Sequence, residues 1–116
     1  MIGGTREVTG VTVVDIEGRF DAISAPKTKT ALHELIEDGN TKLVLNLQKM
    51  DFIDSAGLGV LVSSLRKAAG IGGDLRLAEV PPFCRSIFEL TRLTRVFDVA
   101  QSEEQAIRAM AEDEAP

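Results

Sequence analysis

The sequence has few of the side chains on which disulfides and metal sites depend. Cys84 is its only cysteine and His33 is its only histidine. One cysteine excludes an intrachain disulfide and a cysteine cluster for zinc, and one histidine leaves a transition metal few ligands. We therefore expect no bound metal and no cofactor.

Long apolar runs and an excess of positive charge are also missing. No stretch approaches the roughly 18 apolar residues of a membrane span, and the first residues lack the pattern of a secretory signal. The formal net charge is −5, whereas binding to nucleic acid phosphates needs clustered lysine and arginine. We expect a cytosolic protein that acts away from membranes and nucleic acid.

What is present is the composition of an ordinary globular domain. Of the 116 residues, 44% are hydrophobic and 27% are charged, which is enough to bury one core without disulfides or metals. We expect a single domain over residues 1–116, with a core from about 5 to 111 and an acidic tail at 112–116. Residues 1–4 are expected to be a loose start.

Apolar periodicity predicts a β-hairpin followed by alternating helices and strands. Two β-rich runs at 5–8 and 11–16 flank Thr9-Gly10, which suits a hairpin turn. This order predicts an α/β fold with one mixed sheet covered by about four helices. Further strands are expected at 43–47, 75–78 and 96–99, and helices near Ser24, Ser55, Pro82 and Ser102, the last with a capping-box spacing to Gln105.

The most informative change of pattern lies within residues 43–65. An apolar run at 43–47 suits a strand buried on both faces, residues 50–54 are a predicted turn, and a helical period follows. Ser55 is an N-cap candidate for this helix, and an added phosphate is favoured there because helix N-termini attract anions. The predicted core stripe of this helix is Leu58, Leu61, Val62, Leu65 and Ala69, and that of the next helix is Phe83, Ile87, Phe88 and Leu90.

Two acidic loops are predicted to meet at one edge of the sheet. Asp21 follows one predicted strand, and Asp54-Ser55 follow another. In such sheets functional residues lie at the carboxyl ends of strands, where loops meet helix N-termini. Asp21 and Asp54-Ser55 are therefore candidate halves of one site.

Enzymatic interpretations find little support in these residues. His33 lies mid-helix among polar neighbours, Cys84 has the apolar neighbours of a packing residue, and Ser55 is not in the G-x-S-x-G motif of hydrolases. The glycines at 57 and 59 match no nucleotide-binding motif. A receiver domain would use Asp54 as phosphoacceptor, but it needs a lysine after its last strand, and residues 100–102 contain none. We expect no catalytic residues.

A long central segment resembles the signature of the STAS-domain anti-sigma factor antagonists. It reads LNL at 45–47 and FIDSAGLGVL at 52–61. GRFD at 18–21, followed by Ser24-Ala25, is similar to a second recurring segment of that family. Gly72-Gly73 before a strand and FELT at 88–91 in the next helix also fit, so the resemblance extends from about Val8 to Ile107.

The resemblance implies a small α/β domain whose partner binding is switched by phosphorylation. In that family a GHKL-type serine kinase, which is itself the anti-sigma factor, phosphorylates the antagonist, and a PP2C-type phosphatase reverses the modification. The unphosphorylated antagonist binds the kinase and releases the sigma factor. Ser55 maps to the phosphorylated serine, and Ala56 stands where many members carry a second serine. The partner-facing positions map to Asp21, Ser24, Ile53, Asp54, Ser55, Ala56, Gly57, Leu58 and Gly59.

Small residues in the predicted first turn of the helix have two explanations. Ala56, Gly57 and Gly59 leave this turn bare, so that a kinase active site can reach the hydroxyl of Ser55, or they let the helix pack closely on the sheet. Both explanations can hold together. In the other loop, Arg19 adds a basic charge beside Asp21 and bears on the choice of partner.

Three functional interpretations stay open. The first is a binding module switched by phosphorylation, which is monomeric when free. The second is a STAS scaffold subunit of a stress-signalling assembly or transporter complex, which predicts self-association or co-purification with a membrane complex. The third is a small enzyme, which predicts a turnover abolished by Ser55→Ala.

Overall fold

The computed structural model describes residues 1–112, without the side chain of Glu112, and the rest of the expected acidic tail lies outside these residues. Its strands are β1 (Ile2–Val8), β2 (Val11–Ile16), β3 (Gly18–Phe20), β4 (Lys42–Asn46), β5 (Met50–Ile53), β6 (Asp74–Ala78) and β7 (Val99–Ala100). Its helices are α1 (Ala25–Glu37), α2 (Ser55–Gly70), α3 (Pro82–Leu90) and α4 (Glu103–Glu112), with a 3-10 turn, η1, at Leu93–Arg95.

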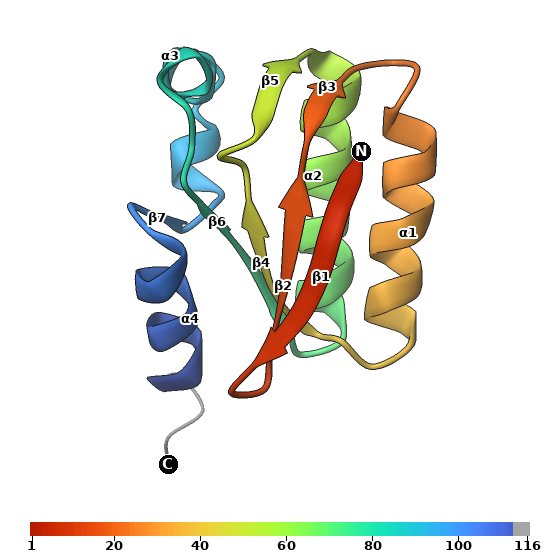
Figure 1. Ribbon diagram of the computed structural model, residues 1–116, viewed down its shortest axis with the longest axis vertical. Coiled ribbons are helices and arrows are strands. Elements are labelled where there is room, and N and C mark those ends of the chain that lie inside the picture. The colour runs from red at the N-terminus through yellow and green to blue at the C-terminus, as the bar shows by residue number, and fades with distance from the viewer. Residues whose placement is uncertain (113–116) are drawn as a thin grey trace.

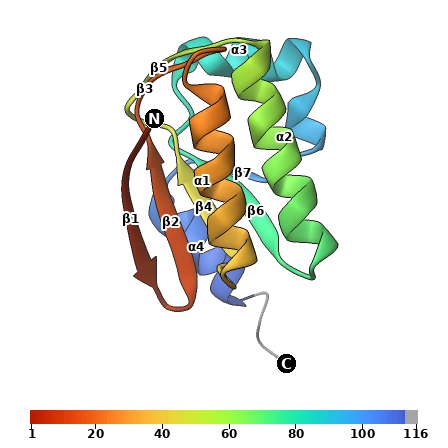
Figure 2. The same ribbon diagram turned by 90° about the vertical axis from the view of Figure 1, so that its right-hand side faces the viewer.

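The main sheet has five strands in the order β1-β2-β4-β6-β7. β1 and β2 form the predicted antiparallel hairpin, and the remaining neighbours pair in parallel. Helices α1 and α2 cover one face of this sheet, and α4 lies on the opposite face (Figures 1 and 2). The predicted α/β fold with a mixed sheet, an N-terminal hairpin and four helices is confirmed.

A second, two-stranded sheet was not predicted. Residues 50–54 were expected to form a turn, but β5 pairs in parallel with β3, with Phe20 opposite Ile53. Four residues are too few to show a strand period clearly, and the pairing partner is about 30 residues away in the chain, where local patterning carries no signal. This small sheet continues beyond the end of the main sheet and leads into both α1 and α2 (Figure 1).

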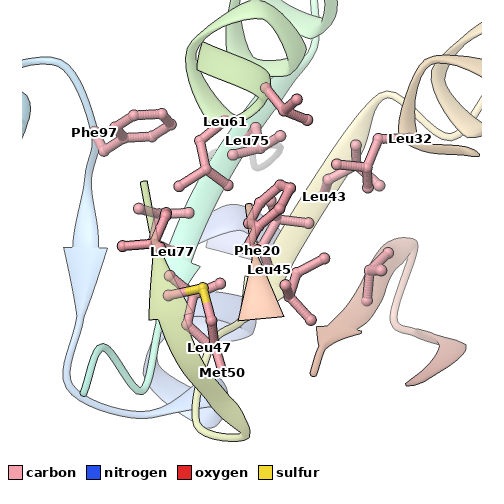
Figure 3. Packing of buried hydrophobic residues seen from close by; sticks show 14 of the residues in the cluster. Phe20, Leu32, Leu43, Leu45, Leu47, Met50, Leu61, Leu75, Leu77 and Phe97 are labelled. Atoms are coloured by element: carbon pink, nitrogen blue, oxygen red, sulfur yellow. The ribbon is translucent and has the colours of Figure 1, made fainter. Parts of the chain in front are cut away.

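The core has two parts, one on each face of the main sheet. β4 alternates between them: Leu43 and Leu45 face α1 and α2, whereas Val44 faces α4. This strand is therefore buried on both faces, as its continuous apolar run predicted. Figure 3 shows the larger part, in which Phe20 from β3 packs among the leucines of the central strands and helices, including Leu32, Leu61, Leu75 and Leu77.

The predicted core stripes of α2 and α3 are confirmed in part, and both helices also bury residues that were not expected. In α2 the fully buried face includes Gly57, Ser64 and Ala68, whereas Ala69 is exposed. Small residues line this face because α2 packs closely on the sheet and on α1. Leu61 is fully buried as predicted, and Leu58, Val62 and Leu65 are half-buried against the core. In α3, Cys84 and Phe88 are buried and Ile87 packs against the core, so Phe83 and Leu90 turn outward.

Smaller differences concern the ends of the chain. β1 begins at Ile2, where pairing with Ile16 orders residues expected to be loose. The last strand is only Val99–Ala100, because the amides of Val96 and Phe97 bond back to the carbonyl of Leu93 in the 3-10 turn. The capping box is half formed: the Gln105 amide donates to Ser102 Oγ at 3.2 Å, but the Gln105 side chain accepts from the Gln101 amide.

Candidate functional site

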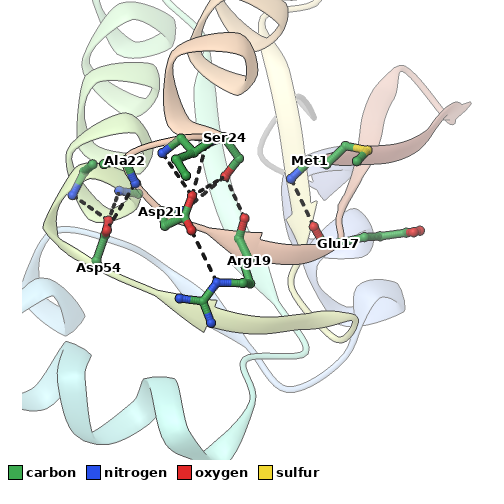
Figure 4. A network of polar contacts seen from close by, with 10 residues as sticks. Met1, Glu17, Arg19, Asp21, Ala22, Ser24 and Asp54 are labelled. Atoms are coloured by element: carbon green, nitrogen blue, oxygen red, sulfur yellow. Dashed lines mark hydrogen bonds and ion pairs between the residues drawn. The ribbon is translucent and has the colours of Figure 1, made fainter.

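The two predicted halves of the site are adjacent in the structure. Because β3 and β5 are parallel neighbours, the loops that follow them leave the same end of the small sheet. The Asp54 amide donates to the carbonyl oxygen of Phe20 at 3.3 Å, and the Ala22 amide donates to Asp54 Oδ2 at 3.1 Å. Figure 4 shows Asp54 facing the loop that carries Asp21 and Ser24.

Asp54, and not Ser55, is the N-cap of α2. Its backbone is extended, and its Oδ1 accepts hydrogen bonds from the amides of Ala56 at 2.9 Å and Gly57 at 3.1 Å. These donors are two of the first amides of the helix, which have no intrahelical partner. The prediction that Ser55 caps the helix is therefore wrong, because a neighbouring aspartate takes that place and moves Ser55 into the first helical position.

The Ser55 hydroxyl is available at the surface. Ser55 is an exposed residue at the start of α2. Within residues 1–112, no hydrogen bond to its hydroxyl is present. A group that reacts with this oxygen therefore has no intramolecular bond to break.

The loop between β3 and α1 is held by Asp21. Its Oδ1 accepts from the amides of Ser24 at 3.1 Å and Ile23 at 3.0 Å, while Ser24 Oγ donates to the carbonyl of Arg19 at 2.6 Å. The pKa of Asp21 is lowered, chiefly by the bond from the Ser24 amide. The bond from the Ile23 amide and the nearby Arg19 guanidinium lower it further, while partial desolvation opposes them. Asp21 therefore stays ionised in weak acid, and this loop stays ordered by bonds to a carboxylate.

The two glycines of α2 have different roles. A side chain on Gly57 would collide with the backbone oxygen of Phe20 and would lie 2.9 Å from Cγ1 of Ile53. A side chain on Gly59 would meet open space. Gly57 thus permits close packing of the helix on β3 and β5, whereas Gly59 leaves the outer surface of the first turns bare. The close-packing explanation is confirmed for Gly57, and access of a kinase at the bare surface near Gly59 stays a prediction.

The structure separates the predicted partner-facing residues into an outer and an inner group. Asp21, Ser24, Asp54 and Ser55 lie together in the two loops and at the start of α2, with Ala56 beside them partly packed against the core, and Gly59 is exposed beyond them. Ile53 is only 5% exposed, Gly57 is buried, and Leu58 is half-buried against the core. These inner residues pack beneath the exposed loops and join them to the core.

One exposed residue of the site was missed by the sequence interpretation. Ile23 is 88% exposed, in the loop between Asp21 and Ser24. Together with Met1, Ile2 and Lys27 it lines an apolar groove of about 490 Å³ beside α1. The available signal was an isoleucine in a polar loop, ahead of the point where the apolar stripe of the helix begins.

Other titratable groups lie away from these loops. His33 is half-buried between α1 and α2, with Nε2 3.3 Å from Ser63 Oγ, and burial together with Lys67 and Lys29 lowers its pKa. Cys84 is buried in the core, which raises its pKa to about 11. In the described part of the chain, no cluster of three histidine, cysteine or acidic residues is arranged to hold a metal. Likewise, none of the helices within residues 1–112 has the length and hydrophobicity needed to cross a membrane.

Comparison with known proteins gives matches over nearly the whole chain. Residues 4–106 match the family model described as STAS domain. The anti-sigma-B factor antagonist of Bacillus subtilis (strain 168) is 30% identical over 95 residues, which cover 82% of this chain and 86% of that protein. An anti-sigma factor antagonist from Mycobacterium paratuberculosis aligns with a TM-score of 0.85 at 25% identity, covering 95% of this chain and 92% of the other. The Bacillus cell fate determinant SpoIIAA in its phosphorylated form aligns with a TM-score of 0.72 at 22% identity, covering 94% and 98%.

Proposed function

Because the chain belongs to the STAS domain family, we propose that it is an anti-sigma factor antagonist whose binding to an anti-sigma serine kinase ends when Ser55 is phosphorylated. A relative at 30% identity that carries the name anti-sigma-B factor antagonist supports the general role. SpoIIAA shares this fold and has been solved in a phosphorylated form, which is consistent with the switch. The proposed kinase is a cytoplasmic GHKL-type ATPase, and a PP2C-type phosphatase restores the binding form.

The single observation that carries this proposal is the position of Ser55. Its exposed hydroxyl stands at the first residue of α2, directly after a carboxylate that is fixed as the N-cap. The open surface at Gly59 leaves room for a kinase to approach along the helix. The loop with Asp21 and the exposed Ile23 lies beside it and completes the proposed contact surface.

Charge explains how the modification would end binding without unfolding the domain. A phosphate adds about −1.5 to −2 charges at neutral pH, and the N-terminal end of a helix accommodates an anion. The loops beside Ser55 already carry Asp21 and Asp54, and Asp51 is exposed in the neighbouring strand β5. A partner surface fitted to a neutral hydroxyl offers no hydrogen-bond donors placed for the phosphate, which would then lose its water without compensation. A loss of roughly 3 to 4 kcal/mol weakens binding several hundredfold.

The test pairs a phosphorylation assay with a binding assay. Candidate GHKL-type kinases from the same genome are incubated with the chain and labelled ATP, and the label is mapped by mass spectrometry. We expect it on Ser55 and not in Ser55→Ala, which still binds the kinase. Ser55→Asp is expected to bind worse than Ser55→Ala. Ser86→Asp, an equal charge change at an exposed serine of α3, is the matched control and is expected to bind normally.

Two outcomes would contradict the proposal. Equal binding by Ser55→Ala and Ser55→Asp would refute the electrostatic switch. Absence of label at Ser55 with every candidate kinase, together with stable self-association or co-purification with a membrane complex, would instead favour the scaffold interpretation.

A further inference from the structure

Arg19 is held in one orientation on the surface beside the site. It lies opposite Phe52 across the small sheet, with its Cζ atom 4.0 Å from the centre of the Phe52 ring. Its Nε donates to Asp21 Oδ2 at 3.3 Å. Cation–π stacking and this bond fix the guanidinium group, although 63% of the side chain remains exposed.

Most of the hydrogen-bonding capacity of Arg19 is unused. A guanidinium has five N–H donors, and only the one on Nε has a partner among residues 1–112. The free terminal amino groups present the planar edge that binds a carboxylate with two parallel bonds. Because the group is already ordered, little side-chain entropy is lost when it binds.

The charges around Arg19 make it unusual on this surface. Asp21 and Asp54 hold the two loops together, and Asp51 is exposed next to Phe52 in β5. Such a surface favours a basic partner, but a fixed arginine within it repels a uniformly basic one. A partner that fits must carry an acidic side chain at the position that meets Arg19.

We propose that Arg19 is a specificity-determining residue, which pairs with an aspartate or glutamate of the partner kinase. This inference rests on the proposed function, since it names the chemistry of the surface that the kinase presents. Arg19 shares that surface with Ser55 through a short series of bonds: Arg19 contacts Asp21, Asp21 orders the loop at 21–24, and the Ala22 amide binds the carboxylate next to Ser55.

The test measures binding of the full chain to the kinase that labels Ser55. Arg19→Ala is expected to bind about tenfold more weakly and Arg19→Glu about 100-fold more weakly, with loss of the salt dependence that this pair contributes. Arg19→Lys should lie between wild type and Arg19→Ala, because it keeps the charge without the planar edge. Arg66→Glu, the same reversal at an exposed arginine of α2, is the control and is expected to stay within about twofold of wild type.

A charge swap then identifies the partner residue. Each exposed aspartate and glutamate of the kinase surface is changed to arginine, and one of these variants is expected to restore binding to Arg19→Glu. The inference is overturned if Arg19→Glu binds like Arg66→Glu, or if no reversed acidic residue restores binding. In both cases Ser55 is still labelled, so the proposed function stands. If no kinase binds or labels the wild-type chain, the proposed function and this inference fall together.

Discussion

Removing the Asp54 carboxylate tests whether one side chain joins the two loops of the site. In the structure its Oδ1 accepts two amide bonds that begin α2, and its Oδ2 accepts the Ala22 amide from the other loop. Asp54→Ala deletes all three bonds and leaves the amides without a protein acceptor. We expect the variant to fold, with reduced stability and a less ordered loop at 21–24.

The size of the effect follows from the bonds that are lost. An N-cap is worth typically about 1 kcal/mol, and the bond from the Ala22 amide at this partly exposed position adds roughly 1 kcal/mol. The expected loss for Asp54→Ala is therefore about 2 kcal/mol of unfolding free energy. Asp54→Asn keeps one oxygen for the cap but turns its NH2 group, a donor, toward the Ala22 amide, so that bond is lost and the expected loss is about 1 kcal/mol.

Urea unfolding followed by circular dichroism measures these differences, provided that the slope of the free energy with urea is unchanged. Asp51→Ala removes an equal charge from the exposed neighbour in β5, whose side chain makes no hydrogen bond or ion pair within the described residues. It should alter stability by less than about 0.5 kcal/mol. If Asp54→Ala and Asp51→Ala are equally stable, the carboxylate does not join the loops and the reasoning about the site is wrong.

The two glycines of α2 and the buried thiol give further predictions. Gly57→Ala should destabilise the domain by about 2 kcal/mol, because its methyl group would overlap the Phe20 backbone. Gly59→Ala, where the methyl group meets open space, should stabilise the domain by about 0.5 to 1 kcal/mol. Equal effects of the two substitutions in urea unfolding would contradict the assigned packing. Burial raises the pKa of Cys84 to about 11, so the folded chain keeps a proton that the unfolded chain loses above pH 9. The free energy of unfolding should therefore fall as the pH rises from 9 to 11, and it should fall less in Cys84→Ala than in the wild type. An equal fall in the wild type and in Cys84→Ala would refute this assignment.

Much of the fold followed from local patterns in the sequence. The apolar run that forms β4 was long enough to indicate burial on both faces, and the glycines at 70–73 marked the end of α2. The hairpin turn at Thr9-Gly10 adopts positive φ at both residues, as a short hairpin requires. These signals are local, which is why one sequence was sufficient to read them.

The missed features depend on contacts between distant segments. The pairing of β5 with β3 joins residues about 30 positions apart, and no local period announces it. Asp54 and Ser55 are both good N-caps, so only the backbone geometry decides between them. The different roles of Gly57 and Gly59 likewise depend on the Phe20 backbone, which the helix meets only after folding.

The stacking of Arg19 on Phe52 belongs to the same class of features. Each residue is unremarkable by itself in the sequence, and their register across β3 and β5 brings the ring under the guanidinium. The exposure of Ile23 has a local cause instead, because its amide bonds to Asp21 two residues earlier in the same loop.

Fastening and recognition are assigned to different side chains in this domain. Asp54 and the Oδ1 atom of Asp21 accept hydrogen bonds from backbone amides, whereas the side chains of Ile23, Arg19 and Asp51 are exposed. Exchanging these three side chains removes the Arg19–Asp21 contact but leaves the amide bonds to Asp21 Oδ1 and Asp54 in place. We therefore expect a library that varies those three positions to keep the domain folded while it samples new binding preferences.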